Sequence, residues 1–162
     1  MALPEELQII ETNLNRELLG IETRSMKGLI MAAAHVRTET EKTSPLTPVD
    51  LGNLRASWFV VTAQKTAVGS GSHQFKGPKA AKLSSDHSST VGEARGIVAS
   101  QSSGRNKFLM MGYSANYALY VHEMMGANFK RPGAGPKWLE SAIKNNSAKI
   151  VQIVKDNAQI KG

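Results

Sequence analysis

The stretch TPVDLGNLRASWFVVTA, residues 47–63, joins a turn to an apolar run. Thr47 is a favourable helix N-cap, Pro48 suits the first helical position, and Gly52 can adopt the left-handed conformation that ends such a turn. Beyond the turn the side chains alternate, and both faces become apolar at residues 58–61. This pattern predicts a strand that other elements cover on both faces at its centre.

Upstream of this strand, residues 4–43 have the pattern of one long helix, and Pro45 ends it. At about 1.5 Å per residue an unbroken helix would approach 60 Å, although Gly20 or Gly28 could bend or break it. Part of so long a helix is expected to pack on another chain. The apolar positions that follow the 3.6-residue period are Leu7, Ile10, Leu14, Leu18, Ile21, Leu29, Ala33 and Val36.

Downstream of the strand, residues 67–93 are rich in Gly, Ser, Lys and Ala and predict either a long mobile loop or the tip of a hairpin, which orders only in an assembly. Strands are expected at 95–102 and 106–113, with SSGR as a hairpin turn between them. A short helix should follow, with Ser114 or Asn116 as its N-cap. A closing helix is expected at about 136–160.

The predicted fold is a single α+β domain. It has a long N-terminal helix and a small, mostly antiparallel sheet of three to four strands with a long basic loop. A C-terminal helix packs on the sheet, so that the helices lie on one face. The expected parts of residues 1–162 are a long helix at 1–44, the sheet with its loop at 45–113, a short helix and Pro/Gly joint at 114–135, and the C-terminal helix at 136–162.

Charge is distributed unevenly along the 162 residues, which have a formal net charge of +7. Residues 1–64 hold 6 basic and 8 acidic side chains, net −2; residues 65–107 hold 7 and 2, net +5; residues 108–162 hold 7 and 3, net +4. This segregation favours either nucleic-acid binding or head-to-tail stacking of identical subunits, while an ordinary lysine-rich surface is the plain alternative.

Several classes of function lack the residues that they need. The chain has no cysteine, and HEMMG at 122–126 lacks the second histidine of a zinc-protease motif. GSGSHQFKGPK has no Gly-Lys-Ser/Thr for a phosphate loop, and the acidic residues after position 50 are sparse. The start, MALPEELQII, is unlike a signal peptide, and no apolar run approaches the roughly 18 residues of a membrane span. We expect no enzyme, cofactor, metal site or membrane partner.

Nucleic-acid binding is the alternative that the basic residues support. The region 76–107 could neutralise phosphates, but few aromatic side chains there could stack on bases. A basic accessory protein, or non-specific contact with passing DNA, stays open as an interpretation. The cations of this region are Lys76, Lys79, Lys82, Arg95, Arg105 and Lys107.

The stretch KRPGAGPKWLESAI, residues 130–143, is typical of a joint that opens a helix. Gly133 suits a turn position with positive φ, and Gly135 is expected as N-cap with Pro136 at the first helical position. Lys137 is unfavourable near a helix N-terminus. We therefore expect Lys130, Arg131 and Lys137 to face an acidic patch on a neighbouring subunit.

Two stretches resemble a known family of bacteriophage proteins. TPVDLGNLRASW at 47–58 is similar to the Thr-Pro-x-Asp-Thr-Gly-x-Leu-Arg-x-Ser signature of tail-completion or neck proteins, with Leu51 in place of the usual threonine. NYALYVHEM…RPGAGPKWLESAI at 116–143 resembles the Tyr-Ala-x-Tyr-Val-His/Glu-Glu block and the Pro-rich joint before the last helix, although many relatives have a shorter joint. The resemblance covers most of the chain outside residues 67–93.

The resemblance implies a structural virion protein at the head-tail junction, made in the host cytoplasm during assembly. It would form a ring of six or twelve copies between the head connector and the tail-tube or tail-terminator proteins, without catalysis. Arg55 is expected to pair with Glu123. The candidate interface residues are Arg55, Tyr117, Tyr120, His122, Glu123, Lys130, Arg131 and Lys137, and the candidate partner-facing or DNA-facing loop holds Lys76, Lys79, Lys82 and Arg95.

Overall fold

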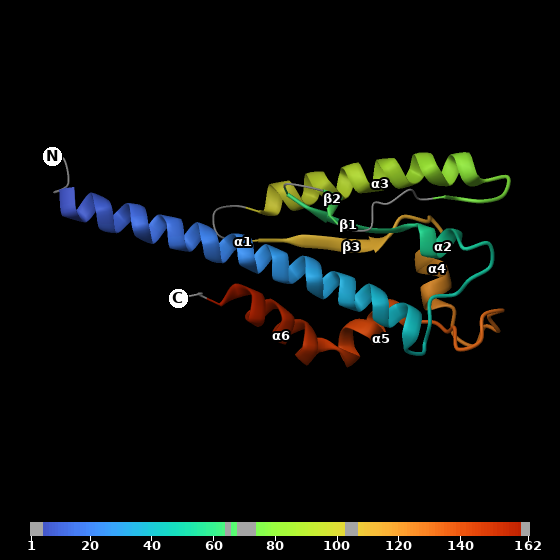
Figure 1. Cartoon of the computed structure of the whole chain (residues 1–162). Coiled ribbons are helices and arrows are strands. Elements are labelled where there is room, and N and C mark those ends of the chain that lie inside the picture. Colours follow the sequence, from blue (N-terminus) through green and yellow to red (C-terminus); the bar gives the residue numbers. More distant parts are fainter. Residues whose placement is uncertain (1–4, 64–65, 68–73, 103–106, 160–162) are drawn as a thin grey trace.

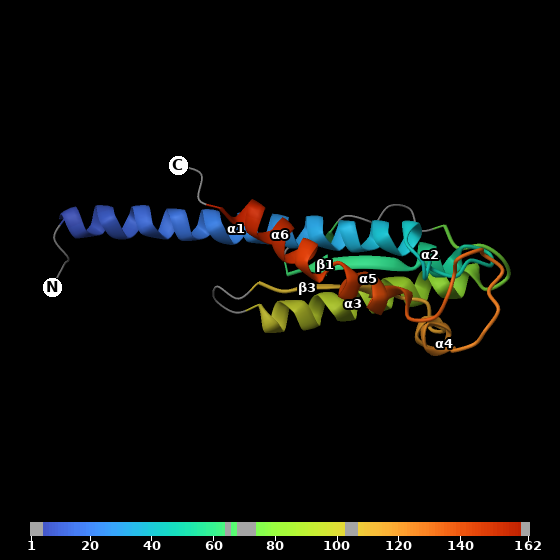
Figure 2. The same cartoon turned by 90° about the horizontal axis from the view of Figure 1, so that it is seen from below.

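The elements of the chain lie in layers, with a small sheet between two helices (Figure 1). The computed structural model describes residues 5–63, 66–67, 74–102 and 107–159. Helix α3 covers one face of the sheet and α1 covers the other, while α5 and α6 pack along α1 (Figures 1 and 2). The elements are α1 Glu5–Lys42, α2 Asn53–Ala56, β1 Trp58–Thr62, β2 Thr66–Ala67, α3 Ala80–Gln101, β3 Leu109–Tyr113, α4 Ala118–Glu123, α5 Trp138–Asn145 and α6 Ser147–Ala158.

The long N-terminal helix is confirmed, and α1 runs without a break through Gly20 and Gly28. Its N-terminal part extends beyond the rest of the domain (Figures 1 and 2). Gly28 lies where α6 crosses: a Cβ atom built there would be 2.9 Å from the Cα of Val154. This glycine therefore permits the close approach of two helices rather than bending α1.

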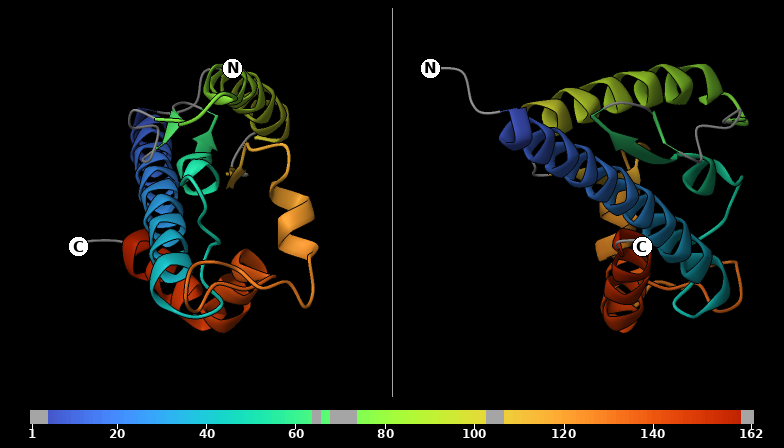
Figure 3. Two further views of the ribbon diagram at one scale, coloured as in Figure 1. Left: turned by 90° about the vertical axis from the view of Figure 1, so that its right-hand side faces the viewer. Right: turned by 60° about the vertical axis from the view of Figure 1, so that its left-hand side comes forward.

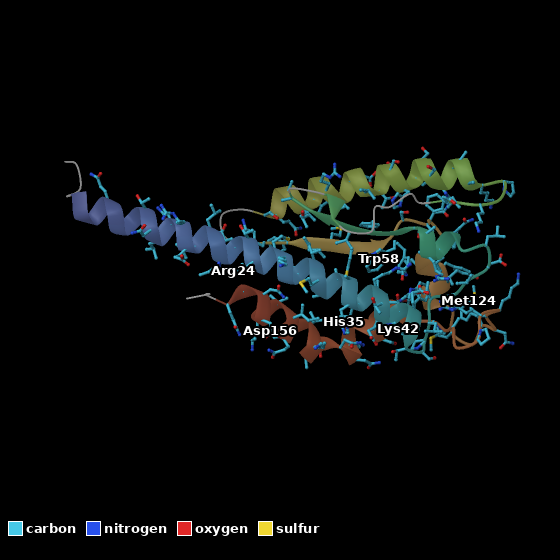
Figure 4. The ribbon with its side chains drawn as sticks, viewed as in Figure 1. Arg24, His35, Lys42, Trp58, Met124 and Asp156 are labelled. Carbon is cyan, nitrogen blue, oxygen red and sulfur yellow. The ribbon has the colours of Figure 1, made fainter. Side chains whose placement is uncertain are left out.

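Strand β1 is the centre of the sheet, and all five of its residues are buried. Trp58 and Val60 pack with Ala33 of α1 in one core cluster, while Phe59 and Val61 pack with α3 in another. Figure 3 shows α1 and α3 on different sides of the strands, and Figure 4 shows Trp58 between the sheet and α1. The predicted coverage of both faces is confirmed, and the expectation of helices on one face only is wrong.

The sheet is smaller than expected. β1 pairs antiparallel with β3 over five positions, from Trp58 opposite Tyr113 to Thr62 opposite Leu109. β2 adds only two residues at the other edge of β1, in the order β2-β1-β3. The mixed helix-and-sheet character is therefore confirmed, whereas three to four full strands are not.

Helix α3 replaces both the strand expected at 95–102 and most of the loop expected at 67–93. The sequence signal was weak because serine, glycine and alanine dilute the apolar period, and one member of the inward stripe is a histidine. Residues 68–73 and most of the expected hairpin turn SSGR lie outside the described residues, as does Arg105. The side chains of α3 that pack inward recur every three or four residues: Leu83, His87, Val91, Ala94 and Val98.

The C-terminal segment forms two helices instead of one. They meet at Asn146, whose side-chain nitrogen donates to the carbonyl of Ala142 at 2.9 Å and whose Oδ1 lies 3.1 Å from Nε2 of His35. Figure 4 labels His35 on the part of α1 that faces these helices. α6 packs along α1, so packing on the sheet was the wrong expectation. α1 offers α6 a longer surface than five-residue strands can.

Two expected helix starts are also wrong. Thr47 and Pro48 are buried in a non-helical segment, and α2 begins only after Gly52, whose φ of 84° matches the predicted left-handed conformation. Helix α4 begins at Ala118 after Tyr117, rather than with Ser114 or Asn116 as N-cap. Thr47 instead hydrogen-bonds the carbonyl of Thr40, at the end of α1.

Candidate functional site

A cleft of about 670 Å³ opens at the end of the molecule opposite the projecting part of α1. The turn before α2, the start of α3, α4 and the segment after α4 form its walls. Figure 4 places Met124 at this end, directly after α4. The large apolar side chains that line the cleft are Leu51, Leu54, Leu83, Val121, Met124 and Phe129, together with the ring of Tyr117.

Four lysines and two aspartates also line the cleft. Lys130 contacts Asp50 at 2.6 Å, and Lys82 contacts Asp86 at 3.3 Å. Among the described residues, the side chains of Lys76 and Lys79 form no salt bridge. The cleft is therefore an apolar surface with an excess of two positive charges.

The segment that carries Lys76 is tied to α2 by its backbone. The side chain of Asn53 donates to the carbonyl of Lys76 at 2.9 Å and accepts from its N–H at 2.7 Å. This reciprocal pair holds residues 76–79 against the turn at 50–53. The three lysines of the predicted basic loop thus lie together at the cleft, whereas Arg95 lies further along α3 and is exposed.

Tyr117 lies at the cleft and is the only predicted aromatic interface residue that lines it. Burial raises the pKa of its hydroxyl, and the nearby carboxylate of Asp50 raises the pKa further. The hydroxyl is therefore neutral at physiological pH and can donate a hydrogen bond to a partner.

Helix α4 also exposes apolar side chains outside the cleft. Leu119 is 73% exposed, Tyr120 71% and Met125, just after the helix, 73%. Contiguous apolar exposure of this kind marks interaction surfaces in soluble proteins. Tyr120 is thus exposed, and its role at an interface stays a prediction.

The joint at 130–137 does not depend on a neighbouring subunit for its counter-charges. Nζ of Lys137 lies 2.5 Å from Glu123 and 3.3 Å from Glu140 of the same chain. Lys137 has a φ of 57° and is itself the residue before α5, so the expected N-cap at Gly135 is wrong. Gly133 has the predicted positive φ, 79°.

Glu123 is the centre of an ion-pair group on the surface. It also accepts from Nδ1 of His122 at 2.9 Å, and the His122 ring packs edge-on against Trp138 with centroids 4.7 Å apart. The hydrogen bonds from Lys137 and then from His122 lower the pKa of the Glu123 carboxyl. Within the chain, this group fastens α4 to α5.

Glu41, which the sequence did not single out, binds three arginines. Its carboxylate lies 2.8 Å from each of Arg37, Arg55 and Arg131. Arg131 also donates to the carbonyl of Thr47 at 2.9 Å, which links the joint to the end of α1. The expected pair of Arg55 with Glu123 is wrong, because Glu41 is the partner.

Groups that could bind a metal ion or pair a serine with a histidine were sought in the described part of the chain. Within residues 5–63, 66–67, 74–102 and 107–159, no group of three or more His, Cys, Asp or Glu could hold a metal ion. The closest serine–histidine contact, His87 Nδ1 to Ser114 Oγ at 2.6 Å, is buried and lies outside the lining of the cleft. In the same described ranges, every helix is too short or too polar to cross a membrane.

Comparison with family models, with curated proteins and with solved structures finds no match to this chain. The site is therefore interpreted from its own residues. Sequence reasoning missed Asp50, Met124 and Phe129 as cleft residues, and it treated Leu51 only as a departure from a motif. The sequence did contain one signal, which is a large apolar residue between an aspartate and a glycine in a turn. In the structure this residue, Leu51, is 53% exposed.

Proposed function

We propose that this chain is a structural subunit of the bacteriophage neck. It would form a ring of six or twelve copies that joins the head connector to the tail or completes the tail. The role is mechanical, without catalysis or a cofactor. The partners would be other copies of the chain, the head connector, and the tail-tube or tail-terminator proteins.

One observation carries this proposal: the two stretches that resemble the neck family form one joint. Leu46 N donates to the carbonyl of Gly133 at 2.8 Å, and Arg131 and Lys130 bind Thr47 and Asp50. The family resemblance therefore maps onto a three-dimensional unit rather than onto two unrelated turns. This support is independent of the order of the motifs in the sequence.

The shape of the molecule is a second support. A projecting helix lies at one end and an apolar, positively charged cleft lies at the other (Figure 1). Rings are built from heterologous contacts, which require two different patches on each subunit. A chain with unlike ends meets this requirement.

Native mass spectrometry and negative-stain imaging test the proposal. The purified chain, alone and mixed with a candidate tail-tube protein, should give a ring of defined mass, and virions should contain the chain at the neck. A strict monomer in solution that is also missing from virions would contradict the proposed function.

A further inference from the structure

The projecting segment of α1, residues 5–19, has properties opposite to those of the cleft. It contains Glu5, Glu6, Glu11 and Glu17 against one arginine, a net charge of −3. Leu14 is 57% exposed and Leu19 63%, although each is large and apolar. Residues 12–17 are all exposed, so none of the other elements that the structure describes covers this part of the helix.

The cleft carries cations that the fold of the chain does not explain. Lys76, Lys79 and Lys82 lie at the N-terminal end of α3, where the helix dipole is positive and lysine is unfavourable. The first turn of α3 has no acidic residue, and of these three lysines Lys82 alone pairs with a carboxylate, that of Asp86, among the described residues. An acidic partner that binds at this end of α3 would account for the position of these lysines.

We propose that the projecting segment of α1 docks, through its acidic and apolar side chains, in the cleft of a second copy of this chain. The contact is of the helix-in-groove kind. Leu14 and neighbouring apolar residues would cover Leu51 and the Tyr117 ring, while Glu17 would approach Lys76 and Lys79. This inference rests on the proposed function and names the contact between subunits of the ring.

The location of the two surfaces makes the contact heterologous. They lie at opposite ends of the molecule, so α1 cannot reach the cleft of its own chain (Figures 1 and 2). Each copy can therefore donate one helix and accept another, which produces a closed ring or an open filament.

Charge exchange tests this contact in the full-length chain. One variant carries Glu11→Lys with Glu17→Lys, and the other carries Lys76→Glu with Lys79→Glu. Each should weaken self-association at least tenfold, because like charges then face each other. The combined variant with all four substitutions should assemble again.

Mixing the two single-surface variants gives a result that few other contacts would give. In the mixture the intact helix of one variant meets the intact cleft of the other, and the lysine-bearing helix meets the glutamate-bearing cleft. Both contacts are then complementary in charge, so the mixture should assemble with the two variants in alternation and in equal amounts. Native mass spectrometry distinguishes this mixed assembly from the monomers that each variant should give alone.

The thermal midpoint separates loss of contact from loss of fold. Lys76→Glu with Lys79→Glu places favourable charge at the N-terminus of α3 and should leave the midpoint of the dilute protein unchanged or raised. A lowered midpoint together with weaker association would mean that the lysines serve the fold, and would overturn the proposal.

Disulfide cross-linking gives a direct test, because the chain has no cysteine of its own. Leu14→Cys with Leu51→Cys should form intermolecular disulfides under mild oxidation, whereas Leu14→Cys with Val151→Cys should not. Rapid cross-linking of the Leu14→Cys variant to itself would show that α1 pairs with α1, and would overturn the proposal.

Different results would contradict the docking contact and the neck function. Rings that keep their mass in both charge-exchange variants would contradict the docking contact and leave the neck function standing. Rapid cross-linking of the Leu14→Cys, Leu51→Cys variant, together with a wild-type chain that forms no ring and is missing from virions, would contradict the neck function alone.

Discussion

At the scale of single residues, two carboxylates of this chain hold most of the cations around the joint. Glu41 binds three arginines from α1, α2 and the joint, and Glu123 binds His122 and Lys137. These groups have different surroundings, since the Glu41 side chain is only 18% exposed and the Glu123 side chain is 47% exposed. We therefore expect Glu41 to matter for stability and Glu123 mainly for local geometry.

Glu41→Gln should lower the free energy of unfolding by about 2 kcal/mol or more, because three guanidinium groups lose a charged acceptor. Urea unfolding measures the change. Glu39→Gln is the matched control on the same helix, since Glu39 accepts only from Thr43 among the described contacts. Equal effects of the two substitutions would contradict a special role for Glu41.

Lys137→Met should raise the pKa of Glu123 more than that of Glu140. Lys137 is the largest cause of the lowered pKa of Glu123, whereas Lys144 is the largest cause for Glu140 and remains in the variant. NMR titration of the side-chain carboxyl carbons measures both values.

The lowered pKa of Glu123 determines the direction in which stability changes with pH. The contribution of Glu123 to stability is fully present above the ordinary glutamate pKa and is lost as pH falls through its lowered pKa. Glu123→Gln should therefore flatten the acid side of the stability curve, and a change confined to alkaline pH would contradict the assignment.

At the scale of elements, glycine has different functions in two helices. Gly28 in α1 lies against the backbone of α6, and a Cβ there would also be 3.2 Å from the carbonyl oxygen of Val154. Gly96 in α3 is exposed, and a Cβ there would meet nothing within 4 Å. The same substitution should therefore have opposite effects at the two positions.

Gly28→Ala should destabilise the fold, because α6 must move away from α1, and this loss exceeds the gain in helix propensity. Gly96→Ala should stabilise it by about 1 kcal/mol, since alanine is the better helix former and no contact is disturbed. Thermal unfolding compares the pair. A gain at both positions would show that α6 does not pack closely on α1.

At the scale of the whole molecule, none of the other described elements covers residues 12–17 of the projecting segment of α1. A helical segment of this length without tertiary packing is marginally stable in water. It is held only by its continuity with residues 20–42, which α6, the sheet and the end of the joint support.

Hydrogen exchange should therefore be fast for residues 5–18 in the dilute chain and slow for residues 29–40. If the segment docks on a second copy, raising the protein concentration should protect residues 5–18 and leave the inner part of α1 unchanged. Mass-spectrometric exchange at two concentrations measures this, and uniform protection along α1 at both concentrations would contradict a free projecting segment.

Sequence by itself determined the parts of this protein that local rules control. The 3.6-residue period defined α1, the doubly apolar run defined β1 as a covered strand, and glycine marked the positive φ angles at Gly52 and Gly133. Each of these depends on residues within a few positions of one another, where steric and periodic effects act.

Tertiary structure alone decided α3, the layering and the partners of the cations. The face of α3 that packs on β1 includes a histidine and small residues. Burial of this face against β1 therefore stabilises the helix more than the helix propensity of its residues does. The carboxylate partners of Lys130 and Arg131 are 80 and 90 residues away. The cleft likewise forms only where three distant segments meet, because contacts over such separations depend on the folded path of the chain.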